Sequence, residues 1–274
     1  MNKTIRKLAY PYYGWLYLLA IVPIAIMLVL VFFDIEGIGF SEARYTFRNF
    51  ALFLEPSTLE AFGNSFLFAT TATLVSAVLG YIVAYQVFRS RFRNKFIILT
   101  LFILPMWSNM LLRTEALGNI MERHNIFTDL LGIPGGFNLR GTGLAVLIGL
   151  VITYLPFMIL PIYTALEKID PSLEEAALDL GVTEMRKFWK VVFPLSIKGV
   201  ITGCIMVFLP CLSGFAIPEI LGNGNIMLIG NIIEQSFRNM SYNLGSLLAI
   251  TILFFIFGSL MIVNKVDKEG GTLI

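Results

Sequence analysis

The chain has 274 residues, of which 57% are hydrophobic and only 14% are charged, and its mean hydropathy is +0.80. Soluble domains are about 45–50% apolar and about 25% charged, so this composition excludes an ordinary soluble protein and indicates a membrane protein. The formal net charge is only +2, which carries little information until the charged residues are assigned to the two sides of a membrane.

Six apolar runs are long enough, or nearly long enough, to cross a bilayer as helices. A hydrocarbon core about 30 Å thick needs roughly 20 residues of helix. The first run has no small-residue cleavage site after it, so we expect a retained first helix and not a signal peptide. The sequence predicts an all-α integral membrane protein. Its six-helix bundle forms a single domain over residues 1–274, with spans at about 13–33, 64–88, 96–112, 144–166, 196–217 and 243–264.

Two of these runs have features that bear on helix packing. The second run carries a small residue at every fourth position, namely Ala72, Ser76, Gly80 and Ala84. Such residues share one face of a helix and allow a second helix to approach closely, so we interpret this ridge as a packing surface. The third run is short at its polar end, where Asn109 and Arg113 occur.

The basic residues indicate the orientation of the chain. If the N-terminus lies inside, 14 of the 20 Lys and Arg residues fall on cytoplasmic segments, and ten of the 18 acids fall on outer loops. Cytoplasmic loops of membrane proteins carry the excess of Lys and Arg, so we expect both termini to be cytoplasmic. The acidic outer face would attract a cationic solute. The exclusion of basic residues from outer loops would, however, leave them acidic in any case.

The two longest outer loops contain local patterns of their own. In residues 113–143 we expect a short amphipathic helix followed by a turn at residues 132–136. In residues 220–242 a turn at residues 222–225 precedes an apolar run, residues 226–233, that is too short to span a membrane. We interpret these loops as re-entrant or vestibule-lining segments.

The longest inner loop, residues 167–198, has the pattern of two short helices. Asp170 is a favourable N-cap with Pro171 at the first helical position, although a capping box that begins at Ser172 is a competing register. Gly181 suits the left-handed residue that ends a helix. The loop is therefore expected to fold as a helix, a glycine turn and a second helix.

The second of these helices is expected to be amphipathic. Thr183 is its expected cap, and Pro194 opens the next span. Its apolar face consists of Met185, Phe188, Trp189 and Val192. A compact pair of helices with exposed apolar and acidic residues suits the binding of a cytoplasmic protein, but a loop that merely lies in the membrane interface has the same pattern.

The spacing within this loop resembles a known signature. Glu175-Ala176-Ala177, then Gly181, Val191 and Phe193-Pro194, matches the EAA motif of ABC-importer permeases, with Val and Phe in place of the usual Ile and Leu. The resemblance implies that residues 167–194 form the coupling segment that binds a separate ATPase subunit. Glu175 would be the polar anchor and Gly181 the turn. The implied coupling residues are Glu175, Ala176, Ala177, Gly181, Phe188 and Pro194.

The resemblance extends over nearly the whole chain and is greatest to the B-type spermidine/putrescine permeases. It is carried by Leu104-Pro105-Met106-Trp107, Leu112-Arg113-Thr114, Leu155-Pro156-Phe157-Met158 and Leu228-Ile229-Gly230-Asn231. Glu115 departs from the family, which often has an aromatic residue there. The resemblance implies the type I permease fold and uptake of spermidine or putrescine by alternating access across a bacterial inner membrane.

The same resemblance implies the partners. A homologous permease subunit would complete a heterodimer, two ATPase subunits would bind inside and use ATP and Mg, and an extracytoplasmic polyamine-binding protein would dock outside. This chain would itself bind no cofactor, metal or nucleic acid.

A path for a polyamine needs separated carboxylates for the ammonium groups and aromatic rings for cation–π contacts. Acids near membrane depth are costly and are therefore functional candidates. Glu219, at the outer end of the fifth span, is the first candidate and Glu115 the second, with Asp34 and Glu36 weaker. The expected aromatic residues are Trp107 and Phe215. The alternative for each acid is a solvated position in an outer vestibule; path lining is favoured over it for Glu219, and neither interpretation is favoured for the others.

Other classes of protein fit the sequence less well. A stand-alone cation channel or secondary transporter would leave the coupling segment unexplained, and a membrane enzyme needs a cluster of catalytic side chains that the sequence lacks. There is no phosphate-binding G-x-x-x-x-G-K-[ST] loop. Cys204 and Cys211 are interpreted as packing residues and not as a disulfide or metal pair, and His124 as a surface residue. A permease for thiamine, sulfate or iron stays an alternative.

Overall fold

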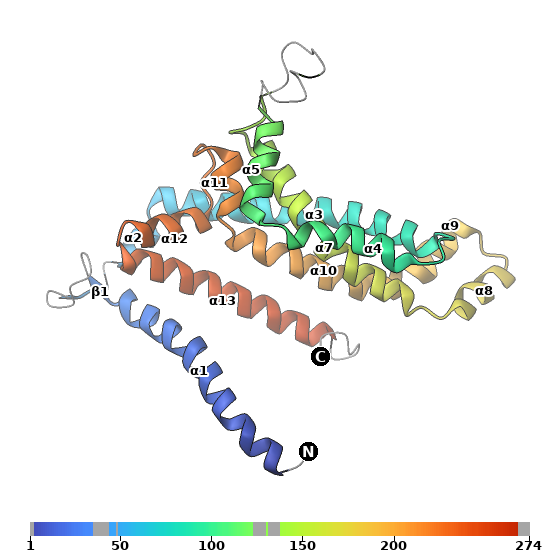
Figure 1. Ribbon diagram of the computed structural model, residues 1–274, viewed down its shortest axis with the longest axis horizontal. Helices are drawn as coiled ribbons and strands as arrows, with labels where there is room; N and C mark the ends of the chain where they lie inside the picture. The colour runs from blue at the N-terminus through green and yellow to red at the C-terminus, as the bar shows by residue number, and fades with distance from the viewer. Residues whose placement is uncertain (1–2, 35–43, 48, 123–129, 131–137, 268–274) are drawn as a thin grey trace. The chain divides into compact units, whose positions relative to one another are not determined.

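The computed structural model describes residues 3–34, 44–47, 49–122, 130 and 138–267, and these residues are mostly helical (Figure 1). The chain divides into two compact units. Unit 1 comprises residues 1–62 and 232–256, and unit 2 comprises residues 63–231 and 257–274. The prediction of an all-α chain is confirmed, whereas the prediction of a single domain stays a prediction.

Five long helices overlap five of the predicted spans. They are α1 (Lys3–Val31), α3 (Pro56–Arg89), α7 (Gly143–Glu167), α10 (Phe193–Ser213) and α13 (Tyr242–Asp267). Among the described residues, five helical segments are long and apolar enough to cross a membrane, and a bent pair would make a sixth. The chain is therefore a multi-pass membrane protein.

The predicted third span, 96–112, is not one straight helix. It is divided among α4 (Lys95–Ile103), the short 3-10 helix η2 (Leu104–Trp107) and the start of α5 (Met110–Ile120). The two parts of the run meet at a bend of 93°. The run is therefore either a broken span or a re-entrant segment, because its first part alone is too short to cross a bilayer.

Polar side chains at the bend explain why the helix breaks. The carboxamide of Asn109 accepts hydrogen bonds from the backbone N–H groups of Leu111 and Leu112, at 2.9 and 3.3 Å, and so caps α5. The guanidinium of Arg113 donates back across the bend to the carbonyl of Pro105 at 2.5 Å. A capping asparagine favours a new helix start over a continuous helix, which the apolar pattern alone did not reveal.

The fifth predicted span, 196–217, also ends in a break. Helix α10 ends at Ser213, Gly214 is extended, and α11 (Ala216–Gly222) begins a new helix. The predicted turn at residues 222–225 follows, with Asn223 and Gly224 in the left-handed conformation. Helix α12 (Ile229–Arg238) comes next. The last two residues of the predicted span therefore belong to α11.

The inner loop has two helical parts, as predicted, but the second does not end before the next span. Helix α8 (Pro171–Asp179) is separated by the Gly181 turn from α9 (Glu184–Lys187). Helix α9 continues through a π-helical turn, η3 (Phe188–Val192), directly into α10. Pro194 lies in the first turn of α10, where its missing N–H is not needed.

Close helix packing in unit 2 centres on Met158 of α7, which is fully buried. A Cβ atom at Gly80 of α3 would lie 2.7 Å from the Met158 side chain, and one at Gly203 of α10 would lie 2.6 Å from its sulfur. The predicted small-residue ridge on α3, from Ala72 to Ala84, is buried at all four positions. The ridge is therefore a packing surface, as predicted.

Unit 1 is held by a buried asparagine. It contains α1, the two-residue strands β1 (Phe33–Asp34) and β2 (Arg44–Tyr45), and α2 (Asn49–Phe53). The carboxamide of Asn49 donates to the carbonyls of Val31 and Phe33, at 2.7 and 3.2 Å. Its oxygen accepts a hydrogen bond from Asn243 of α13 at 3.0 Å. Asn49 therefore satisfies the carbonyl of the last residue of α1, Val31, and one carbonyl of β1.

We predict that Gly80→Leu destabilises the protein by about 1–3 kcal/mol, because the new side chain must displace Met158. The matched control is Gly63→Leu on the same helix, where no atom lies within 4 Å of the added Cβ. Thermal unfolding of the detergent-solubilised protein checks the prediction, and equal effects of the two substitutions would contradict it.

Candidate functional site

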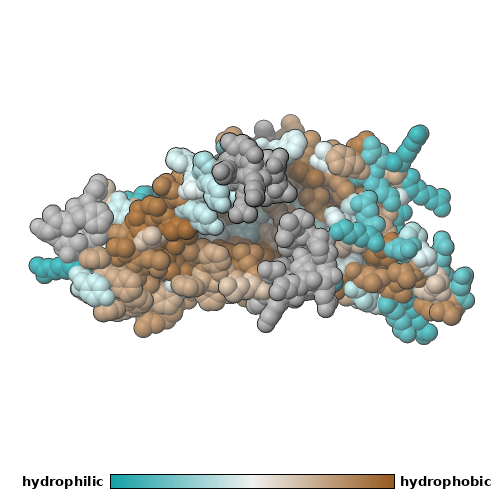
Figure 2. Space-filling model, turned by 90° about the horizontal axis from the view of Figure 1, so that it is seen from below, coloured by the Kyte–Doolittle hydropathy of each residue, from teal (hydrophilic) through white to brown (hydrophobic). Residues whose placement is uncertain are grey.

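Two groups of candidate residues lie at opposite ends of unit 2. Figure 1 shows α8 and α9 at one end, and α5 and α11 together at the other. Figure 2 shows hydrophilic residues gathered at the end that carries α8 and α9, whereas much of the remaining coloured surface is hydrophobic. This distribution is that of helices crossing a membrane with a polar end segment.

Helix α8 is closed at both ends by local hydrogen bonds. The carboxylate of Asp170 accepts the backbone N–H of Ser172 at 2.9 Å, and this bond lowers the pKa of Asp170 below its usual value. At the other end Gly181 is left-handed, with φ +75°. The N–H groups of Gly181 and Val182 bond to the carbonyls of Leu178 and Ala177, at 2.8 and 3.2 Å. This is a Schellman motif, and both predicted caps of α8 are confirmed.

The buried face of α8 is fixed by an ion-pair network. Glu174 is only 7% exposed. Its carboxylate accepts a hydrogen bond from Arg89 at the end of α3 and lies 3.4 Å from the ammonium of Lys187, which is 4% exposed. Lys187 also pairs with Glu184 at 2.8 Å. The network therefore ties α8 to both α3 and α9.

The sequence prediction singled out Glu175 and missed Glu174. A helical wheel could have found it, because Glu174 and Ala177 are three residues apart and share a face, and Ala177 is buried as well. Glu175 and Ala176 are exposed on α8. Ala177, predicted to allow close approach of a partner, packs within this chain.

The exposed surface of this end is apolar as well as acidic. Beside Glu175 lie five exposed large hydrophobic side chains, Leu173, Leu178, Leu180, Met185 and Trp189. Several exposed large apolar side chains on one polar end segment are typical of a protein or membrane contact. The arrangement is that of a helix presented for docking.

An aromatic cluster joins the coupling segment to α3. The ring of Phe188 packs edge-on against Tyr85 and Tyr81, with centroids 5.1 and 5.8 Å apart. The hydroxyl of Tyr81 is 2.8 Å from the hydroxyl of Ser196 in α10. Tyr81, Tyr85 and Arg89 are spaced by four residues and so form one stripe of α3. This stripe contacts α10, η3 and α8 in turn.

At the opposite end, Glu219 is exposed on α11 and is oriented by a buried asparagine. The carboxamide of Asn231, which is 2% exposed, donates to the Glu219 carboxylate at 2.9 Å and to the carbonyl of Phe215 at 3.1 Å. Phe215 is exposed and lies four residues before Glu219, so the ring and the carboxylate share one face. The sequence predicted both residues but gave Asn231 no such role.

Glu115 is engaged within the chain. Both of its carboxylate oxygens accept from Arg140, at 2.9 and 3.1 Å, and Arg140 also pairs with Glu122 at 2.6 Å. Burial opposes the charge of Arg140, but the bonds to Glu122 and Glu115 outweigh it and raise its pKa. Arg140 further donates to the carbonyl of Ile220 at 3.4 Å. Arg140 therefore connects α5 to α11, and Glu115 would have to share its charge with Arg140 to bind a solute.

The remaining predicted residues are not gathered at one point. Trp107 is 85% exposed on η2, at the bend before α5. Asp34 pairs through its backbone with Arg44 in unit 1. Glu36, His124 and the predicted turn at residues 132–136 lie outside the described residues. Asn231 links the Glu219 carboxylate to the backbone of Phe215, the N-cap of α11, and Arg140 links Glu115 to α11.

The cysteines and metal-binding side chains form no site in the described part of the chain. Cys204 and Cys211 are free cysteines, and Cys211 is buried in the core. Among the described residues, no three His, Cys, Asp or Glu side chains are grouped to hold a metal ion. The chemistry of the described residues is therefore that of ion pairs, hydrogen bonds and apolar contacts.

Residues 1–266 match the family described as "Binding-protein-dependent transport system inner membrane component". The chain belongs to this family. It is a permease subunit of an ABC importer and a transport protein, not an enzyme. The EAA-like segment, the multi-pass helices and the family model therefore agree.

Curated relatives include several polyamine permeases. The spermidine/putrescine transport system permease protein PotB of Haemophilus influenzae is 31% identical over 270 residues, 94% of each chain. The protein of the same name from Escherichia coli K12 is 32% identical over 244 residues, 87% of this chain and 89% of that one. The probable sulfate transport system permease protein cysT of Marchantia polymorpha is 27% identical, over 78% of this chain and 75% of that one.

Solved structures share the fold. A chain from the crystal structure of a bacterial ABC transporter involved in the import of the acidic polysaccharide alginate has a TM-score of 0.77, with 98% of this chain and 96% of that one covered. The same transporter in complex with an alginate pentasaccharide-bound periplasmic protein also gives 0.77. The sequence identity is 13% in both, so this similarity shows the permease fold alone.

We predict that Glu174→Ala lowers stability by on the order of 3 kcal/mol, because Lys187 is left buried beside fewer negative charges. The neighbouring Glu175→Ala should leave the melting temperature nearly unchanged, since Glu175 is exposed. Thermal unfolding of the two purified variants checks the contrast. A larger loss for Glu175→Ala would mean that α8 is oriented differently.

Proposed function

We propose that this chain takes up polyamines of the spermidine and putrescine class, as one subunit of an ATP-driven importer that works by alternating access. The observation that carries the proposal is the separation of two sites in unit 2. Glu219 and Phe215 lie at one end, and the exposed α8 lies at the other. The names of the 31–32% identical relatives support the solute class.

The Glu219 end suits a cationic solute. A carboxylate beside an exposed aromatic ring offers an ammonium group both an ion pair and a cation–π contact. The hydrogen bond from Asn231 fixes one carboxylate oxygen and leaves the other available. A sulfate or alginate ligand would be repelled by this carboxylate, which favours a polyamine over the solutes named for the other relatives.

The α8 end suits an ATPase partner. Glu175 would form a polar contact there, and the exposed leucines of α8 would fill an apolar groove. Because Glu174 ties α8 to α3, a movement of the ATPase would be passed to the helices of the bundle. This role requires α8 to face the cytoplasm, which agrees with the excess of Lys and Arg on that side.

The proposal implies a larger assembly in a bacterial inner membrane, with both termini of this chain cytoplasmic. A homologous permease subunit forms a heterodimer with this chain. Two ATPase subunits bind ATP and Mg on the inside, and a polyamine-binding protein delivers the solute to the α5 and α11 end. These partners are inferred from the resemblance and from the family.

Uptake of labelled spermidine by the assembled transporter in proteoliposomes tests the solute. We predict that Glu219→Gln lowers ATP-driven uptake at least about tenfold, since a lost ion pair at a partly desolvated site is worth about 1.4 kcal/mol or more. The control is Glu60→Gln, an exposed acid on α3. Uptake of sulfate instead of spermidine by the unmodified transporter would reject the solute class.

Coupling is tested separately with Glu175→Arg. We predict that this variant keeps its melting temperature but loses most ATP-driven uptake, because the reversed charge weakens ATPase binding at α8. Co-purification of the ATPase subunit, measured with uptake, checks the cause. Normal uptake and normal co-purification would show that Glu175 is not the anchor.

A further inference from the structure

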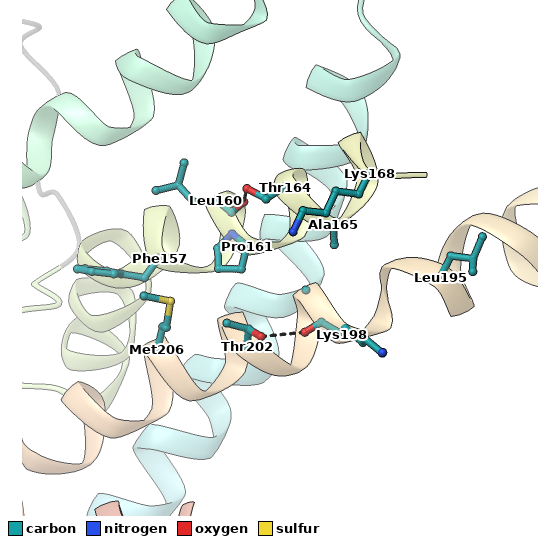
Figure 3. Close-up of a pocket in the computed structure, with 11 residues that line it drawn as sticks. Phe157, Leu160, Pro161, Thr164, Ala165, Lys168, Leu195, Lys198, Thr202 and Met206 are labelled. Carbon is teal, nitrogen blue, oxygen red and sulfur yellow. Dashed lines mark hydrogen bonds between the residues drawn. The ribbon is translucent and has the colours of Figure 1, made fainter. Parts of the chain in front are cut away.

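An apolar pocket of about 430 Å³ opens between α7 and α10 (Figure 3). Such a volume is within the range of ligand pockets. Its lining comes from Phe157, Leu160, Pro161, Thr164, Ala165 and Lys168 of α7 and its end, and from Leu195, Lys198, Gly199, Thr202 and Met206 of α10. The proposed transport and coupling sites use none of these residues.

The pocket has one basic end. Lys168 is the C-cap residue of α7, and Lys198 lies in the second turn of α10. Both are therefore near the end that carries α8. In Figure 3 the Lys168 side chain runs back along α7 and places its ammonium beside Thr164, over the pocket. Among the described residues, neither ammonium has a hydrogen-bond or ion-pair partner.

The other polar groups of the pocket are already satisfied. The hydroxyl of Thr164 donates to the carbonyl of Leu160 at 2.9 Å, and that of Thr202 donates to the carbonyl of Lys198 at 3.0 Å. Among the polar side chains of the pocket, the two ammonium groups are therefore those without a hydrogen-bond partner in the described part of the chain. A fitting ligand has one anionic group and an otherwise apolar body.

The close contact of the two helices forms the floor of the pocket. A Cβ atom at Gly199 would lie 2.6 Å from the carbonyl oxygen of Pro161 and 2.6 Å from the Ala165 side chain. The backbones of α7 and α10 are in contact at this point. On either side of it, larger side chains hold the two helices apart and leave the pocket open. The pocket is thus formed by the helix packing itself.

The charge of the pocket excludes the transported polyamine as its ligand. Two uncompensated ammonium groups repel a polycation, and Glu219 lies at the opposite end of unit 2 (Figure 1). The two ends of the pocket also differ, because one is basic and the other is apolar. From Lys198 to Met206 the helix rises by about 12 Å, so the basic end and the apolar end are separated along the axis of α10.

We propose that this pocket binds an anionic phospholipid. The phosphate lies at headgroup level beside Lys168, and Lys198, whose side chain points away from Lys168 in Figure 3, turns toward it on binding. An acyl chain lies along α7 and α10 over Phe157, Pro161 and Met206. Basic pockets between spanning helices on the cytoplasmic side are suited to anionic headgroups, which are attracted at about 1 kcal/mol for each basic residue near the surface. The proposal depends on the membrane fold and not on the identity of the solute.

The test compares the purified, delipidated full chain in nanodiscs of phosphatidylcholine with and without phosphatidylglycerol. We expect phosphatidylglycerol to raise the melting temperature and to remain bound in native mass spectrometry. Lys168→Gln with Lys198→Gln should abolish both effects. The matched control is Lys190→Gln, an exposed lysine of η3 outside the pocket, which should retain them.

Two further arms separate the alternatives. Met206→Trp fills the apolar part and keeps both lysines, so it should also lose the bound lipid; this variant keeps the proposal testable if the double variant does not fold. Equal stabilisation by inorganic phosphate alone would show that a free anion, and not a lipid, occupies the basic end.

Cross-linking identifies a protein occupant. If Met206→Cys cross-links to the homologous subunit in the assembled transporter, a partner helix fills the pocket and the lipid proposal is overturned. It is equally overturned if the double lysine variant retains phosphatidylglycerol as the unmodified protein does. Absence of the cross-link together with loss of lipid in the variant supports it.

Discussion

The buried carboxylate of Glu174 is the interaction on which the orientation of the coupling segment depends. A desolvated charge is stable only when its partners stay in place, and here the partners are Arg89 of α3 and Lys187 of α9. The bonds fix which face of α8 is buried and therefore direct Glu175 outward. The stripe of Tyr81, Tyr85 and Arg89 extends this connection along α3, so the segment and the spanning helix are joined as one piece.

The other end of unit 2 is organised by polar groups that bridge chain breaks. Arg140 connects α5 to α11, and Asn231 connects the start of α12 to Phe215 and Glu219. Broken helices leave backbone groups free, and in a membrane protein such groups must find partners within the protein. One of the side chains that meets this need, Asn231, also bonds to the Glu219 carboxylate. A residue that satisfies a free backbone group is therefore also a residue of the proposed solute site.

Glycine determines how closely the helices approach. Gly80 lets α3 pack closely against α7, and Gly199 and Gly203 do the same for α10, because a Cβ atom at any of the three would lie within 3 Å of an atom of α7. Around the contact at Gly199, larger residues leave the pocket with its two lysines. Small residues thus allow the tight helix contacts. The pocket lies next to such a contact, where larger side chains keep the two helices apart.

The sequence by itself determined the membrane class, the five long helices, the two caps of α8 and the small-residue ridge, because each follows from composition or from spacing along one helix. It did not determine the 93° bend, since the apolar run continues past the capping Asn109. Nor did it identify Glu174, Asn231 or Arg140 as central. Their partners lie 85, 12 and 25 residues away in the chain, and only the tertiary structure brings such charges and amides within bonding distance.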